Sequence, residues 1–181
     1  FNQDVSVLPP NLTHLTFGEK FNQDISYLPP TLTHLTLDYY FNQNLLSLPQ
    51  SITHLIIMAR EFNKQCAVPS NVKYLKLNFN NSDLINNLPN SVIELELCYG
   101  FNLEINNLPT SIKKLIISKN CSYDKDLNCL PNFIEELEIN SSYNKRILNI
   151  PTNLKKISCN VNYPYINDFV NCEVETYTFC E

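Results

Sequence analysis

The sequence predicts a mainly β protein: a parallel β-solenoid of about nine turns of about 20 residues each, with little or no helix. Three observations carry this prediction. Proline recurs at a nearly fixed spacing, aliphatic residues recur in phase with it, and an aromatic residue followed by asparagine opens most turns. A fixed period of this size is typical of chains in which each repeat forms one turn of a coil.

The proline series sets the length of each turn. Consecutive prolines are 20 residues apart except for one step of 22, and Asn171 occupies the place of a ninth. Because proline has no N–H, we expect each one at the corner that leads into a strand, where no sheet hydrogen bond is needed. The eight prolines are Pro9, Pro29, Pro49, Pro69, Pro89, Pro109, Pro131 and Pro151.

Each turn also carries the pattern L-x-x-L-x-L, which begins three residues after the proline, first at Leu12. Its alternation and its content of Val, Ile and Thr favour a short strand. One turn cannot bury its own apolar side chains, so stacked turns must share an interior. The sequence therefore predicts that Leu35, Leu55 and Leu75 lie in one column, on strands that pair in parallel.

An aromatic residue at the start of each turn forms a second apolar column. Asn81 stands in its place in the fifth turn and is expected to interrupt the column. With only 2 glycines in the chain, we expect the asparagines that follow the aromatics to form corners. They would either satisfy backbone groups or adopt the left-handed conformation. The aromatics are Phe1, Phe21, Phe41, Phe62, Phe101, Tyr123, Tyr143 and Tyr163.

Every second residue of a strand points away from the interior, so three outward columns run along the predicted sheet. Alternating charges in the second half of the first column predict cross-strand ion pairs that fix the register. Its three histidines form a line rather than converging on one point, which favours a solvated row over a metal site. Mutual repulsion predicts a lowered pKa for His34. The first column is His14, His34, His54, Tyr74, Glu94, Lys114, Glu136, Lys156 and Thr176.

The third and fourth turns contain the best candidate for a partner-binding site. Apolar and aromatic side chains gathered on a polar face are typical of interfaces. The alternative is a scatter of surface hydrophobic residues without a function. The candidate residues are His54, Ile56, Met58, Tyr74 and Lys76, and the aromatics just after the strands, Tyr39, Tyr40, Phe79 and Tyr99, would extend the patch along one edge.

The form LP-x-(S/T/N)-(L/I/V)-x-x-L-x-(L/F/I), with F-N opening the turn, resembles the FNIP repeat, a very short leucine-rich-type repeat. Residues 21–29 and 101–109 carry the resemblance, which covers residues 1–160. It implies a leucine-rich-repeat-like fold and no known catalytic residues. It also implies an origin in social amoebae or giant DNA viruses, with a cytoplasmic location, in the host cytoplasm if viral. Some viral relatives carry an F-box before the repeats, which implies a substrate receptor for a ubiquitin ligase; the present chain has no F-box.

The predicted organisation is eight FNIP or leucine-rich-type turns over residues 1–160, followed by a degenerate capping turn over residues 161–181. The 7 cysteines show no CxxC pair, so free thiols in a reducing compartment are expected. A Cys172–Cys180 bridge is the alternative for a secreted protein.

Composition excludes several function classes. A net charge of −5 argues against nucleic acids and acidic membranes as partners, and the chain has no apolar run that could span a bilayer. We expect no metal, no cofactor and no catalytic residues, because two glycines cannot build a phosphate loop and the carboxylate pair Glu94 and Glu96 has no cleft. The predicted function is a non-catalytic protein–protein interaction scaffold. The alternative is a structural or self-assembling protein that forms end-to-end homo-oligomers through its open ends.

Overall fold

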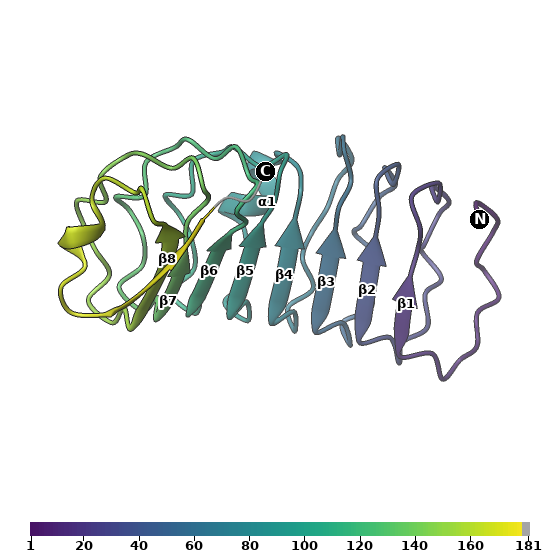
Figure 1. The fold of residues 1–181 in the computed structure, drawn as a ribbon. Helices are drawn as coiled ribbons and strands as arrows, with labels where there is room; N and C mark the ends of the chain where they lie inside the picture. Colours follow the sequence, from purple (N-terminus) through teal and green to yellow (C-terminus); the bar gives the residue numbers. More distant parts are fainter. Residues whose placement is uncertain (179–181) are drawn as a thin grey trace.

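The computed structural model describes residues 1–178, which wind into an elongated coil with one strand in every turn (Figure 1). Nine parallel strands form a single sheet in the order of the sequence. The predicted fold class, a mainly β parallel solenoid with almost no helix, is therefore confirmed. The strands are β1 His14–Thr16, β2 His34–Leu37, β3 His54–Ile57, β4 Tyr74–Leu77, β5 Glu94–Leu97, β6 Lys114–Ile117, β7 Glu136–Glu138, β8 Lys156–Asn160 and β9 Glu173–Tyr177.

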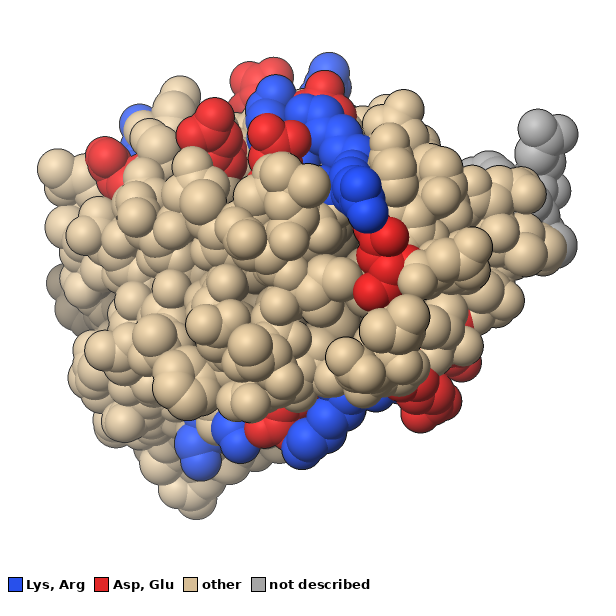
Figure 2. Space-filling view, turned by 90° about the vertical axis from the view of Figure 1, so that its left-hand side faces the viewer, with Lys and Arg blue, Asp and Glu red and all other residues tan. Residues whose placement is uncertain are grey.

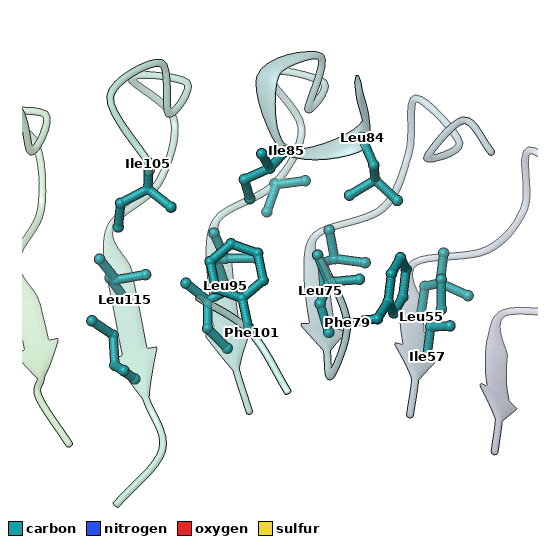
Figure 3. Packing of buried hydrophobic residues seen from close by; sticks show 14 of the residues in the cluster. Leu55, Ile57, Leu75, Phe79, Leu84, Ile85, Leu95, Phe101, Ile105 and Leu115 are labelled. Atoms are coloured by element: carbon teal, nitrogen blue, oxygen red, sulfur yellow. The ribbon is translucent and has the colours of Figure 1, made fainter. Parts of the chain in front are cut away.

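The interior of the coil is a continuous apolar column. Leu35 pairs with Leu55 and Leu55 with Leu75, and each of the three is at most 1% exposed. Figure 3 shows the same succession from Leu55 to Leu115 on neighbouring strands. Burying a leucine side chain contributes about 1.5–3 kcal/mol, so this shared interior is the main source of stability.

The prolines lie at the corners that lead into the strands, as predicted. At all eight corners the proline carbonyl accepts a hydrogen bond from the N–H three residues later, for example from Leu12 to Pro9 at 3.1 Å and from Leu32 to Pro29 at 3.1 Å. This closes a tight turn, and the proline's missing N–H costs nothing because the turn uses only its carbonyl.

The corner that follows each opening aromatic recurs from turn to turn, and its geometry comes from asparagine side chains rather than from left-handed backbone. No non-glycine residue in the described part of the chain has a positive φ, so the left-handed alternative is wrong. Instead, the side-chain oxygen of one asparagine accepts a hydrogen bond from the backbone N–H of the equivalent residue in the next turn. This asparagine ladder joins Asn2 to Asn22 and Asn22 to Asn42 at 2.8 Å, and Asn42 to Asn63 at 3.2 Å.

The fifth turn places an aromatic side chain in the core, contrary to the prediction that Asn81 interrupts the column. Phe79 is 3% exposed and its ring lies 4.9 Å from that of Phe62, so it supplies the aromatic two residues early. Asn80 then belongs to the asparagine ladder, because its side-chain oxygen accepts a hydrogen bond from the N–H of Asn102 at 2.7 Å. Because Phe79 stands two residues early, the connection to Pro89 is two residues longer, and it contains the helix α1, Ser82–Asn86. The buried Leu84 and Ile85 of this helix face the interior (Figure 3). Phe79 is consequently core and does not extend the surface patch.

The ninth turn has a different register from the predicted one. Lys156 pairs with Glu173, not with Thr176, and Ile157 pairs with Val174. The turn is three residues shorter than the 20-residue turns because Pro164 and the 3₁₀ helix η1, Ile166–Asp168, tighten the connection. Cys180 lies outside the described residues, and the six cysteines within them are all free thiols.

Candidate protein-interaction face

The exposed face of the sheet carries the candidate site. Strand pairing aligns the first outward column from His14 to Lys156 in the predicted order, so the register of its first eight members is confirmed. The third outward column, which consists of Gly18, Asp38, Met58, Asn78, Cys98, Ser118, Asn140 and Asn160, is less exposed than predicted at two positions, because Cys98 and Asn140 are buried. Met58, Asn78 and Ser118 of the same column remain half-buried, so the face narrows only at these two positions.

The five candidate residues lie side by side on β3 and β4. His54 pairs with Tyr74 and Ile56 pairs with Lys76, while Met58 directly follows β3. All five side chains are half-buried. The structure thus brings the predicted residues together, and they form one surface, which we call the β3–β4 patch.

Glu96 organises one side of this patch, a role that the sequence interpretation missed. Its carboxylate accepts hydrogen bonds from Tyr74 Oη at 2.7 Å and Ser118 Oγ at 3.0 Å, and it pairs with Lys76 Nζ at 2.8 Å. Burial and the Glu96 hydrogen bond raise the pKa of Tyr74. Burial opposes ionisation of Glu96, but Lys76 and Tyr74 together hold the pKa of its carboxyl below the ordinary value. The sequence carried a signal for this role, because Glu96 is the cross-strand neighbour of Lys76 and has the opposite charge.

The second half of the face is an ion-pair network. Lys114 Nζ lies 3.4 Å from Glu94 and 3.6 Å from Glu136. Lys156 turns toward β9 and contacts Glu175 at 3.0 Å, rather than completing the predicted pair with Glu136. Figure 2, which views the coil from the end nearest β8, shows side chains of both charges next to one another along the borders of a largely uncharged end. The network satisfies its own charges and fixes the register.

Glu138 lies half-buried in a hollow of about 140 Å³ that Lys114, Glu136, Lys156 and Glu175 of this network also line. Burial, with a contribution from Glu96 and Glu175, raises the pKa of its carboxyl. Ser158 lines the same hollow, and its hydroxyl donates to Glu175 at 2.8 Å.

The three histidines form a stack, which we call the histidine column. The ring of His34 lies 4.0 Å from that of His14 and 4.1 Å from that of His54, with interplanar angles of 12° and 10°. Each Nδ1 is 2.9 Å from the hydroxyl of the preceding threonine. Burial, followed by His54 and His14, lowers the pKa of His34, in the predicted direction. Within residues 1–178 no group of His, Cys, Asp and Glu side chains is arranged to hold a metal ion.

Comparison with known proteins places this face in context. The model of the FNIP repeat matches residues 1–40, 27–59, 62–100 and 79–120. Among solved structures, the chain is similar to CroV588 of a giant virus, described as a novel circular LRR protein, with 32% identity and a TM-score of 0.67. The similarity covers 88% of this chain but 29% of CroV588. A search of curated proteins gives no match.

Within the described residues, no helix is long and apolar enough to cross a bilayer. The repeat pattern, the proline corners, the asparagine ladder and the family match agree over most of the coil. The chain belongs to the FNIP-repeat family.

Proposed function

We propose that the chain is a non-catalytic interaction scaffold and that the β3–β4 patch binds a protein partner. The single observation that carries this is the strand register, which gathers two uncommitted apolar side chains, Ile56 and Met58, beside the aromatic rings of His54 and Tyr74. Elsewhere on the face most charged side chains are already paired with one another, so a partner gains less by covering them.

The patch is also rigid before a partner arrives. Glu96 holds Tyr74 and Lys76 in place, while the main chain of Met58 donates to Leu37 at 2.8 Å. A preorganised surface loses less side-chain entropy on binding, and aromatic anchors of this kind carry much of the energy of protein interfaces.

Substitution of Ile56 and Met58 by serine tests the proposal, and Ile116 offers a control position. Ile116 occupies the same outward column on β6 and is half-buried like Ile56. We expect a protein captured by the wild-type chain to bind the Ile56→Ser, Met58→Ser double variant at least about tenfold more weakly, and to bind Ile116→Ser unchanged. Quantitative mass spectrometry after capture, followed by titration of the identified partner, measures this. Equal capture by all three proteins contradicts the proposal.

A second candidate function, assembly of copies of the chain, is favoured by the open sheet. The strand order runs from β1 to β9 without closing. Within the described residues, the two end strands, β1 and β9, therefore each have one edge without a pairing partner. Free strand edges are templates for pairing with another chain. Light scattering at increasing protein concentration tests it: a rising mass supports assembly, and a constant monomer mass contradicts it.

We also propose, from the family alone, that the face could serve as a substrate receptor for a ubiquitin ligase. Such a role requires an F-box in the same protein. The sequence upstream of Phe1 tests it directly, since an F-box there would support the role and any other domain would contradict it.

A further inference from the structure

The hydrogen bonds of two threonines fix which ring nitrogen carries the proton in His34 and in His54. The hydroxyl of Thr33 donates to the carbonyl of Thr13 at 3.0 Å, and that of Thr53 donates to the carbonyl of Thr33 at 3.3 Å. Each hydroxyl has one proton, which is thereby used, so it can only accept from the neighbouring Nδ1. His34 and His54 therefore carry their proton on Nδ1 at neutral pH, and an added proton goes to Nε2.

No carboxylate of the flanking columns faces these rings. The column is bordered on one side by Thr13, Thr33 and Thr53 and on the other by Thr16, Thr36 and Ile56.

The charged and titratable groups closest in the fold to the histidine column lie at its end or beyond these flanking threonines and Ile56. Tyr74 is the next ring, 5.8 Å from His54, and its hydroxyl is bound to Glu96. Asp38 follows β2 and accepts from the N–H of Tyr39 at 2.7 Å. In the next turn, Lys76 on β4 is paired with Glu96, and Lys73, which precedes the strand, donates from its N–H to Thr53 at 2.8 Å. The described residues therefore offer a protonated histidine column no counter-charge in direct contact.

The length of the column matches an extended peptide. Adjacent rings are 4.0 and 4.1 Å apart, so the outer rings lie about 8 Å apart. Side chains on one face of an extended strand recur every second residue, about 7 Å apart. Two carboxylates on such a strand can therefore contact both ends of the column, with the central ring between them.

We propose that the histidine column is a proton-gated docking strip for an acidic, extended segment of a partner protein. The proposal rests on the proposed function, since it uses the same sheet face, and it adds the chemistry of the partner. At neutral pH the Nε2 lone pairs repel carboxylates. A ring that gains a second proton carries a positive charge and donates from Nε2. His14 and His54 disfavour a proton on His34, and the carboxylates of an acidic partner would offset this repulsion. Such a partner would therefore bind more tightly as the pH falls.

The experiment uses the three histidines as their own reporters, because the chain contains 3 histidines in total. The probe is a synthetic peptide with aspartate at every second position and glycine between, and its control has asparagine in place of aspartate. We expect the aspartate peptide to bind at least about tenfold more tightly at pH 5.5 than at pH 7.5 and to raise all three imidazole pKa values in NMR titrations.

Variants separate this site from general charge attraction. His→Asn substitution at positions 14, 34 and 54 retains a donor near the threonine hydroxyls and should abolish the pH dependence. Lys114→Gln removes a positive charge from the same outward column and should retain it. Circular dichroism at both pH values, recorded on each protein, establishes that the coil is folded under the binding conditions.

Equal affinity at the two pH values, or equal binding of the asparagine peptide, overturns the proposal. So does unchanged pH dependence in the triple variant. These outcomes are distinct from failure of the proposed function, which is measured at neutral pH through Ile56 and Met58 and does not involve protonated histidine.

Discussion

At the scale of single residues, the two glycines of the chain occupy opposite environments. A Cβ on Gly100 would lie 2.2 Å from the carbonyl oxygen of Asn78, whereas a Cβ on Gly18 would have no atom within 4 Å. Gly100 also donates from its N–H to the side chain of Asn78 at 2.9 Å. Two turns therefore approach each other at Gly100 more closely than any other residue would permit.

We expect Gly100→Ala to lower the free energy of unfolding by about 1–3 kcal/mol, because the clash is with backbone that cannot rotate away. Gly18→Ala is the matched control and should leave stability unchanged or raise it by about 0.4–1 kcal/mol, through the unfolded state. Urea denaturation of the two variants measures the difference. Equal stability of the two would show that the turns are not packed as described.

The tyrosines of the aromatic column differ in whether their hydroxyls are satisfied. Tyr163 donates to the carbonyl of Lys145 at 2.8 Å, whereas the buried hydroxyl of Tyr143 has no hydrogen-bond partner among residues 1–178. We expect Tyr143→Phe to be neutral or stabilising by up to about 1 kcal/mol, and Tyr163→Phe to destabilise by about 0.5–1.5 kcal/mol. Thermal unfolding monitored by circular dichroism measures both. A larger loss for Tyr143→Phe than for Tyr163→Phe would contradict this assignment.

At the scale of elements, the helix α1 shows how one irregular turn fits a regular stack. Phe79 enters the core early, and the remaining residues before Pro89 form a short helix that buries Leu84 and Ile85. The helix begins at Asn81, whose side chain accepts from the N–H of Leu84 at 2.9 Å. The residue that seemed to interrupt the aromatic column is thus a helix cap.

Asn81→Ala should therefore destabilise the chain by about 0.5–2 kcal/mol through loss of the cap. The exposed neighbour Ser82 makes no side-chain hydrogen bond in the described structure, so Ser82→Ala should stay within about 0.5 kcal/mol of wild type. Hydrogen exchange of the α1 amides would localise the effect. Faster exchange spread evenly over all turns would contradict a local cap.

The elements that could not be predicted are those in which spacing alone is ambiguous. In the fifth turn, Phe79 and Asn81 were both near the expected position, and only packing selects Phe79. In the ninth turn, Tyr177 and Val174 both fit the apolar pattern, and the short path through Pro164 and η1 decides in favour of Val174. Apolar periodicity fixes a register only where the length of each connection is known.

At the scale of the whole molecule, the period was sufficient to predict the architecture. Each turn repeats the same inward and outward pattern, so the parallel sheet, the shared interior and the membership of the β3–β4 patch followed from positions alone. The hydrogen bonds that give the face its chemistry did not follow. The network around Glu96 and the threonine contacts of the histidine column depend on side-chain rotamers, which a periodic pattern leaves open.

The central claim is that residues one turn apart are stacked neighbours within a common interior. Methyl-labelled NMR tests it most directly, through nuclear Overhauser contacts of the Leu55 methyl groups. The account predicts cross-peaks from Leu55 to both Leu35 and Leu75, its partners on β2 and β4. Cross-peaks confined to residues close to Leu55 in the sequence, with none to Leu35 or Leu75, would contradict it.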